Sequence, residues 1–401
     1  MKTWLEQRDK ITKVMNRLDS SFFFYNLDHL KSHLQSIASV IDDDVKLWYA
    51  CKANPYSGIL KIFRNLGFGI DVASKGELDQ VISSGVTSDH IIATGPSKSK
   101  KYFKELLDND VDVIVLESIN QAYWLDQAAA DLGKKPQVLL RVQLAWQEGS
   151  SVLGGDAITP FGIEDEAWLE LDQSKTTNLQ MIGFHVFQWG NLMDVTRLKK
   201  IWWHIGQTLS RLSVQMNIPL EVIDLGGGLG VPYNFNDPML DFNEVNKVLK
   251  EFKAEFKPQK IWMELGRYTV ASCGTYFTQI IDRKAVRGKE ILVTDGGINH
   301  IARVALTGQA FPCSLFRDSK SSNTSFQVHG PLCTALDALG TFELPSDAAP
   351  GDWLAFSMAG AYGFTEAMPF FLCHNLPAEV TYYNGDLMTP RPVRSSADWL
   401  V

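Results

Sequence analysis

The sequence predicts an α/β fold in which a closed (β/α)8 barrel is followed by a second, β-rich domain. Short apolar runs recur along the first two thirds of the chain, with helix-like stretches between them, and this alternation is typical of βα units around a parallel sheet. The runs cover residues 47–52, 67–73, 90–95, 111–117, 137–144, 180–187, 220–226 and 260–265. At 401 residues, the chain is also long for a single folding unit.

The predicted domain limits follow from the connecting helices and from a change in the sequence pattern near residue 268. Apolar spacing of about 3.6 residues predicts connecting helices at 57–65, 75–84, 118–132, 198–216 and 242–256. Beyond residue 268, β-rich pieces alternate with glycine and proline turns, at 274–282, 290–294, 324–330 and 352–358. The strand-like run 21–25 precedes the barrel and is expected to join this β-domain. We therefore predict a barrel over 27–268 and a β-rich domain from 1–26 and 269–401.

Composition excludes several classes of protein. The net charge of −8 and the lack of a Lys/Arg-rich run argue against a nucleic-acid partner. The five cysteines are few, widely spaced and odd in number, which predicts free thiols in a reducing compartment. The N-terminus is too charged for a signal peptide, and no apolar run reaches the roughly 18 residues that span a bilayer. We therefore expect a cytoplasmic protein that does not enter a membrane.

One lysine and one glycine turn carry the first chemical prediction. The run 47–52 ends at Lys52, where a polar turn begins, and a lysine amine there can form a Schiff base with an aldehyde. The run 220–226 leads into Gly226, Gly227 and Gly228, whose bare backbone N–H groups can approach an anion closely. A lysine for an aldehyde and a glycine turn for a phosphate together suggest pyridoxal phosphate.

Other predicted strands also end in polar residues. Reactive groups of a barrel lie at the C-terminal ends of its strands, and so many polar ends are hard to explain as scattered surface polarity. The candidate residues at these ends are Lys52, Asp71, Arg141, His185, the glycine turn and the segment from Glu264 through Gly266 and Arg267. We expect them to converge on one cofactor site.

These motifs give the chain a resemblance to the fold-type III, alanine-racemase-like group IV pyridoxal-phosphate decarboxylases, which include diaminopimelate and ornithine decarboxylases. The resemblance extends from the run 21–25 to Ala361-Tyr362-Gly363. It implies that Lys52 forms the Schiff base with the cofactor and that His185 stacks on the cofactor ring. It also implies a phosphate site made by Gly226, Gly227, Gly228, the backbone of Gly266 and Arg267, and Tyr362.

Two residues of this resemblance indicate the reaction. A carboxylate at Glu264, against the pyridine nitrogen, keeps that nitrogen protonated and the ring able to accept electrons. Alanine racemases resemble the chain less at this position because they place an arginine there, so Glu264 favours decarboxylation. Cys333, in the segment 330–337, resembles a loop cysteine that reaches across a dimer interface and protonates Cα after carbon dioxide leaves. The resemblance thus implies a homodimer with shared active sites, an amino-acid substrate and no metal.

Departures from the best-known members bear on the substrate. Diaminopimelate and ornithine decarboxylases carry an acidic residue after the loop cysteine, where this chain has Thr334, and a neutral hydroxyl cannot neutralise a distal ammonium. Arg267, His300 and Arg303 could instead contact substrate carboxylates. Leu265 stands where diaminopimelate decarboxylases have proline, and a tyrosine expected within 307–311 is missing.

The stretch 183–194 is similar to the longer form found in decarboxylases of carboxylate siderophore pathways, such as staphyloferrin B, vibrioferrin and achromobactin, which also have Cys-Thr in the loop. We therefore expect decarboxylation of an L-amino acid conjugated to citrate or a similar acid. One alternative is diaminopimelate decarboxylase. Another is a non-catalytic regulatory homologue that binds the cofactor, against which intact Lys52, Glu264 and Cys333 count.

Overall fold

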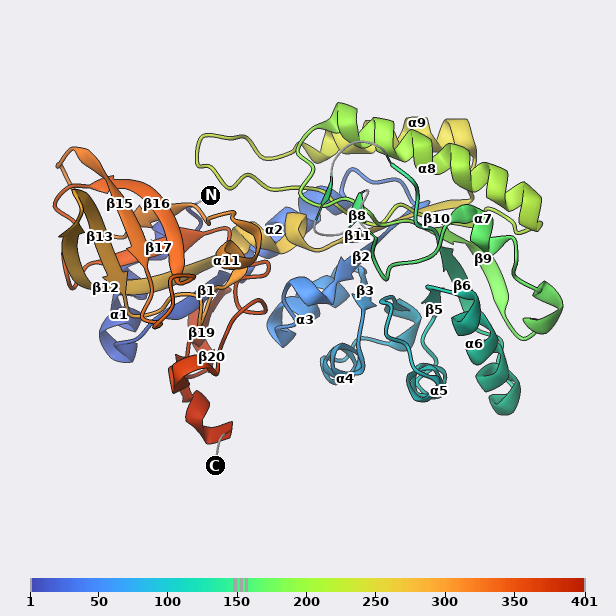
Figure 1. Cartoon of the computed structure of the whole chain (residues 1–401), viewed down its shortest axis with the longest axis horizontal. Helices are drawn as coiled ribbons and strands as arrows, with labels where there is room; N and C mark the ends of the chain where they lie inside the picture. The colour runs from blue at the N-terminus through green and yellow to red at the C-terminus, as the bar shows by residue number, and fades with distance from the viewer. Residues whose placement is uncertain (1, 147–149, 152–153, 156–157, 400–401) are drawn as a thin grey trace. The chain divides into compact units, whose positions relative to one another are not determined.

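The computed structural model describes residues 2–146, 150–151, 154–155 and 158–399 (Figure 1). The chain divides into two compact units. The barrel unit comprises the described parts of Leu34–Val231 together with Met239–Tyr268. The β unit comprises the described parts of Met1–His33, Pro232–Pro238 and Thr269–Val401. Each unit is described by itself.

The barrel unit is a closed barrel of eight parallel strands, as the sequence predicts (Figure 1). Seven of the eight predicted apolar runs contain one strand each, and the run 47–52 overlaps the first strand, which begins two residues earlier. The strands are β2 (Val45–Ala50), β3 (Gly69–Val72), β4 (Ile91–Ala93), β5 (Val113–Leu116), β6 (Gln137–Arg141), β9 (Gln180–His185), β10 (Val222–Asp224) and β11 (Lys260–Leu265). Neighbours follow chain order from β2 to β11, and β11 pairs with β2 to close the ring. All strands therefore end at the same rim.

Helices connect the strands, and several of them begin at a side-chain cap. They are α2 (Leu27–Ala38), α3 (Ser57–Asn65), α4 (Lys75–Ser83), α5 (Lys100–Asp108), α6 (Ile119–Leu132), α7 (Asp165–Trp168), α8 (Val195–Met216) and α9 (Phe242–Phe256). Ser74, Ser99 and Ser118 each accept a backbone N–H from the first turn of the helix that follows, which satisfies an otherwise unpaired donor. All five predicted connectors are confirmed, whereas α2, α5 and α7 lie outside them.

An apolar layer fills the barrel below its C-terminal rim. It consists of Trp48, Ile92, Val113, Val115, Leu139, Ile182, Val222 and Trp262, all buried. The rings of Trp48 and Trp262 meet edge to face with their centroids 5.0 Å apart. Side chains alternate along a strand, so the residues two positions beyond Val222 and Trp262 also face inward. Those residues are Asp224 and Glu264, which places carboxylates directly above the apolar layer.

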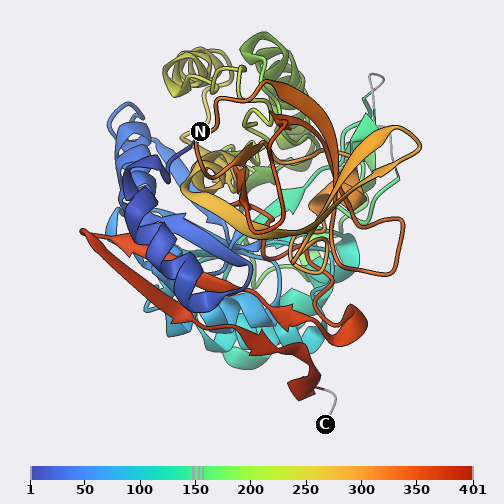
Figure 2. The ribbon, with the colours of Figure 1, turned by 90° about the vertical axis from the view of Figure 1, so that its left-hand side faces the viewer.

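The β unit is built on a nine-stranded sheet with the path β16-β15-β13-β12-β1-β19-β20, and Figure 2 turns these strands toward the viewer. The strands are β1 (Phe22–Asn26), β12 (Gly274–Val286), β13 (Lys289–Thr294), β14 (Cys313–Leu315), β15 (Asn323–His329), β16 (Ala338–Pro345), β17 (Trp353–Ser357), β19 (Ala378–Tyr383) and β20 (Asp386–Arg391). β1 pairs antiparallel with β12 and parallel with β19. The run 21–25 therefore joins the β-domain, as predicted.

The first helix and the sheet share an aromatic core in the β unit. Helix α1 (Arg8–Leu18) contributes Ile11, Val14 and Met15 to a buried cluster with Trp4 and the phenylalanines of β1 and β12. The rings of Phe22 and Phe277 stack with centroids 5.1 Å apart. Aromatic side chains of this size dominate the energetics of a core, which anchors β1 in the sheet.

All five cysteines are free, as the sequence predicts; Cys51, Cys273 and Cys313 are buried, and Cys333 and Cys373 are exposed. In the part of the chain that the structure describes, no helix combines the length and the apolar character needed to cross a bilayer.

Candidate active site

The amine of Lys52 lies at the C-terminal rim of the barrel, held by Asp71. β2 ends at Ala50, and Lys52 lies in the single 3-10 turn Cys51–Ala53 that follows. Its Nζ donates to Oδ2 of Asp71 over 3.1 Å, and Oδ1 of Asp71 accepts the hydroxyl of Thr94 over 2.6 Å. Asp71 is buried, whereas the Lys52 side chain is 36% exposed. The carboxylate therefore fixes an amine that an incoming aldehyde can reach.

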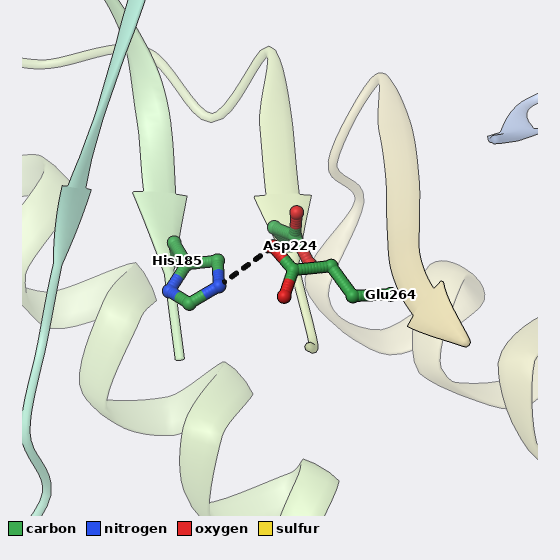
Figure 3. A group of neighbouring side chains, drawn as sticks. All are labelled: His185, Asp224 and Glu264. Atoms are coloured by element: carbon green, nitrogen blue, oxygen red, sulfur yellow. Dashed lines mark hydrogen bonds and ion pairs between the residues drawn. The ribbon is translucent and has the colours of Figure 1, made fainter. Parts of the chain in front are cut away.

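His185, Asp224 and Glu264 form a buried cluster at the ends of β9, β10 and β11 (Figure 3). One ligand atom from each residue lies within 4.8 Å of the others. Nε2 of His185 and Oε1 of Glu264 are 3.0 Å apart. These distances give the rim of the barrel a compact group of one imidazole and two carboxylates.

The contact between His185 and Glu264 fixes their charges. Burial opposes ionisation of Glu264, but the adjacent His185 outweighs it and lowers the pKa of Glu264 to about 2. Burial likewise disfavours the charged imidazole, but Glu264 outweighs it and raises the pKa of His185. Glu264 is therefore a carboxylate at neutral pH, the state that a protonated pyridine nitrogen needs beside it.

The glycine turn after β10 packs its backbone against the neighbouring strand. Gly226 and Gly228 adopt left-handed conformations with φ of 61° and 84°. A Cβ on Gly227 would lie 1.9 Å from the carbonyl oxygen of Glu264. The N–H of Glu264 also donates to the carbonyl of Gly226 over 2.7 Å. Only glycine fits at these positions, and the resulting turn is a cradle with no side chains of its own.

Arg141 belongs to a buried ion network that the sequence analysis did not foresee. Its Nη1 donates to Oε1 of Glu117 over 3.0 Å, and Oε2 of Glu117 accepts the N–H of Gly162 over 2.7 Å. Nζ of Lys98 lies 3.9 Å from the same carboxylate. Burial lowers the pKa of Lys98 to about 8. Glu117 follows β5 directly, so a systematic reading of strand ends would have found it.

The other predicted residues lie in the β unit. Tyr362 adopts a left-handed conformation, φ 60°, and the guanidinium of Arg303 lies 4.9 Å from its ring centroid. Cys333 is exposed and Thr334 is half-buried. The cofactor role of Tyr362 and the roles of Cys333 and Thr334 stay predictions, as do the backbone contacts predicted for Gly266 and Arg267 in the barrel unit.

His300 is placed differently from what a substrate contact needs. Nδ1 lies 2.8 Å from the hydroxyl of Tyr276 on β12, and Nε2 lies 2.7 Å from the carbonyl oxygen of Asn375. Burial lowers the pKa of His300 to about 4. The ring is neutral at pH 7 with both nitrogens engaged, which speaks against His300 as a source of positive charge for an acidic substrate.

The barrel residues fit pyridoxal phosphate. Nδ1 of His185 and Oδ2 of Asp224 are buried polar atoms without a partner in the described chain, as is common where a ligand completes a site. Lys52 would bind the aldehyde carbon, Glu264 would face the ring nitrogen, and the turn at Gly226–Gly228 would take the phosphate. When bound, this cofactor supplies a sink for the electron pair released as a Cα bond breaks.

Comparison with known proteins gives the same cofactor. A family model described as "Pyridoxal-dependent decarboxylase, pyridoxal binding domain" matches residues 27–271. The L-glutamyl-[BtrI acyl-carrier protein] decarboxylase of Niallia circulans is 28% identical over 396 residues, 94% of this chain and 92% of that protein. A diaminopimelate decarboxylase of Aquifex aeolicus is 24% identical over 410 residues, 99% of this chain and 96% of that protein.

A third relative, from Staphylococcus aureus, is named 2-[(L-alanin-3-ylcarbamoyl)methyl]-2-hydroxybutanedioate decarboxylase. It is 28% identical over 374 residues, 88% of this chain and 92% of that protein. Among solved structures, diaminopimelate decarboxylase of Helicobacter pylori with L-lysine has a TM-score of 0.87 at 21% identity, covering 97% of this chain and 98% of that one. The chain belongs to the pyridoxal-dependent decarboxylase family and is a pyridoxal-phosphate-dependent amino-acid decarboxylase.

Proposed function

We propose that this enzyme decarboxylates an L-amino acid whose distal end is joined to citrate or a similar carboxylate-rich acid, as in siderophore assembly. The observation that carries the proposal is the charge of the loop around Cys333. The residue after the cysteine is Thr334, whose Oγ1 accepts the N–H of Leu336 over 3.2 Å. A threonine gives no charge to a distal ammonium.

The one acidic residue in the segment 330–337 is occupied elsewhere. Oδ1 of Asp337 accepts the N–H of Ile298 over 2.7 Å, and Oδ2 accepts the N–H of Leu332 over 2.7 Å. Asp337 is 1% exposed. Its buried carboxylate therefore braces the loop and is not exposed to solvent. A diamino acid with a free distal ammonium would find no counter-ion in this loop.

Arg303 lies in the same unit, and its charge is paired with Glu366. Its Nη1 donates to both carboxylate oxygens of Glu366, over 3.1 and 2.8 Å. Its Nε is buried without a hydrogen-bond partner in the described chain. Buried N–H groups without an acceptor are unfavourable, so a substrate carboxylate at Nε would satisfy this donor. Arg303 thus supports recognition of an acidic group.

The names of two relatives support a conjugated substrate. The S. aureus name describes an alanine joined through a carbamoyl group to a hydroxybutanedioate, and the N. circulans name describes a glutamyl group on a carrier protein. Both are amino acids already joined to a second group. Diaminopimelate is the second candidate substrate, favoured by the coverage of the A. aeolicus relative, which is 99% of this chain.

In this proposal the chain's own groups divide the work. Lys52 would hold the cofactor until the substrate amine takes its place, and Glu264 would keep a proton on the ring nitrogen. The cofactor, when bound, would accept the electron pair of the bond between Cα and the carboxylate, so that carbon dioxide could leave. The Cys333 thiol then gives its proton to Cα. Burial of His185 and Glu264 keeps water away from the ring face, which limits wrong protonation.

A substrate panel tests the proposal. We expect measurable turnover of the substrate named for the S. aureus relative, and weak or absent turnover of meso-diaminopimelate, ornithine and lysine. A missing buried charge pair corresponds to roughly 2 to 5 kcal/mol, or about 30-fold to several thousand-fold in kcat/KM. Efficient turnover of meso-diaminopimelate, at about 10⁴ M⁻¹s⁻¹ or above, would refute the proposal. Turnover confined to a glutamyl thioester would favour a carrier-bound substrate.

Two variants of Thr334 test whether the charge at this position determines substrate preference. Thr334→Glu places a carboxylate after Cys333 and should raise the relative activity on free diamino acids. Thr334→Val keeps the position neutral and should leave the order of substrates unchanged. If Thr334→Glu has no effect on the order of substrates, residue 334 does not determine specificity for the distal group.

Cys333 is predicted to act in the active site of the partner subunit of a two-fold dimer. Inactive Lys52→Ala and inactive Cys333→Ala proteins, mixed and allowed to exchange, should form dimers in which one of two sites is intact. Under random exchange about half the dimers are mixed, so activity should recover to at most about a quarter of wild type. No recovery, despite mass-spectrometric proof of exchange, would show that both residues serve one chain or that Cys333 is not catalytic.

A further inference from the structure

Asp224 lies between the glycine turn and the histidine of the cluster. Its Cα pairs with the Cα of His185 in the ladder between β10 and β9, and the N–H of Val186 donates to its carbonyl over 2.9 Å. Both Asp224 and His185 are 0% exposed. Neighbouring positions of parallel strands face the same side, so the two side chains project together into the barrel.

The two carboxylate oxygens of Asp224 differ in their contacts. Oδ1 accepts the N–H of Gly226 over 2.8 Å, which fixes the first residue of the glycine turn. Oδ2 is buried without a partner in the described chain, and so is Nδ1 of His185. A buried carboxylate with a bare oxygen is unfavourable for folding alone. We therefore infer that Asp224 has a functional role in the candidate active site.

The other carboxylates named in the barrel interior already accept hydrogen bonds or contact His185. Asp71 accepts from Lys52 and Thr94, and Glu117 accepts from Arg141 and Gly162. Glu264 contacts His185 but is also the group proposed to face the ring nitrogen of the cofactor. A carboxylate that serves the ring nitrogen can no longer be the sole counter-ion of His185. Asp224 is the remaining anion beside that imidazole.

We propose that Asp224 is a positioning residue that keeps His185 charged and in place when Glu264 is engaged by the cofactor, while its other oxygen fixes the phosphate turn. This inference rests on the proposed cofactor role of the cluster. The charged groups that face His185 are Glu264 from β11, Asp224 from β10 and Arg141 from β6, and the other charged groups of the site are Asp71, Lys52, Lys98 and Glu117.

Titration of Asp224 sets the pH range of this role. Burial, and then the nearby Glu264, raise the pKa of Asp224 to about 7 against the opposing effect of His185. Below that pH Asp224 is neutral and gives His185 no counter-charge. The support that Asp224 gives to the imidazolium should therefore appear as the pH rises through about 7 and be lost as the pH falls.

The test follows the His185 imidazole by nitrogen-15 NMR in the protein loaded with pyridoxal phosphate, with the resonance assigned by its loss in His185→Gln. Asp224→Asn keeps the shape and the acceptor for Gly226 but removes the charge. The pH at which His185 deprotonates should fall by about one unit or more, and affinity for pyridoxal phosphate, read by absorbance titration, should fall as well. Asp224→Ala, which also releases Gly226, should bind pyridoxal phosphate more weakly still.

The matched control is Asp241→Asn, because Asp241 makes the same contact to the N–H two residues ahead at the exposed start of α9. It should leave both readouts at wild-type values. If Asp224→Asn also leaves both unchanged while Asp224→Ala weakens cofactor binding, Asp224 only braces the turn and the proposal is overturned.

Wild-type protein provides a second measurement that needs no variant to fold. When pyridoxal phosphate is added at a fixed pH, the fraction of His185 that is protonated should not fall. Deprotonation of His185 on binding would contradict the proposal. These readouts involve no amino-acid substrate, so they can succeed even if every substrate proposed above fails.

Discussion

Replacing Lys52 with alanine is expected to abolish both turnover and the covalent link to the cofactor. The side chain ends 3.1 Å from Asp71 at the rim of the barrel, and without its amine nothing at this position can bind the aldehyde carbon. We expect kcat/KM to fall by roughly 10³-fold or more, about 4 kcal/mol of transition-state stabilisation. Carbon dioxide release and the visible absorbance of bound pyridoxal phosphate measure the two effects.

The control for this variant is Lys199→Ala, which removes an exposed lysine from α8 that pairs with Glu251. It should retain normal turnover because exposed pairs contribute little. A Lys52→Ala protein that keeps turnover and a reducible link to the cofactor would show that another lysine performs this role.

Replacing Glu264 with glutamine should leave cofactor binding intact but reduce turnover by roughly two or more powers of ten, about 2.7 kcal/mol or more. Glutamine keeps the shape and an acceptor for His185 but cannot hold a proton on the ring nitrogen, so the electron sink weakens. Absorbance titration measures binding, and single-turnover release of carbon dioxide measures the chemical step.

Glu251→Gln serves as the matched control, since it makes the same exchange at an exposed position on α9. It should be indistinguishable from wild type. Near-normal turnover of Glu264→Gln would mean that the ring does not depend on this carboxylate.

The barrel was predictable because its strands are apolar runs with regular helical spacing between them. Both α3 and α9 match their predicted bounds. Helix α5 was not predicted: its sequence KKYFKELLD is short and rich in charge, although Ser99 caps it. The partners of β1 could not be predicted, because pairing with β19 joins residues more than 350 positions apart, and local periodicity carries no information on such contacts.

The site was predictable where position along a strand decides it. Lys52, Asp71, Arg141, His185 and Glu264 lie at strand ends, and the C-terminal ends of parallel strands share one rim. Which side chains touch was not predictable, since it depends on register between strands. Asp224 was overlooked beside the more conspicuous glycines, and the pairing of Glu117 with Arg141 emerges only from the fold.

The same limit explains His300. Its sequence neighbourhood, with Arg303 three residues ahead, suggested an anion-binding segment. Its actual partners are Tyr276 on β12 and the backbone of Asn375, both distant in sequence. Whether a histidine is protonated depends on such contacts, and they cannot be predicted from the residues next to it in sequence.

The most direct test is to locate the cofactor on the chain. The barrel interior holds two lysines close to the candidate site, Lys52 beside Asp71 and Lys98 beside Glu117. Burial gives Lys98 a pKa of about 8, but its side chain is 0% exposed and its Nζ donates to the carbonyl of Gly95, so the aldehyde reaches Lys52 more easily. Borohydride reduction of the pyridoxal-phosphate-loaded enzyme, followed by digestion and mass spectrometry, should place the phosphopyridoxyl group on Lys52. A label on Lys98, or on any other lysine, would contradict the site described for this enzyme.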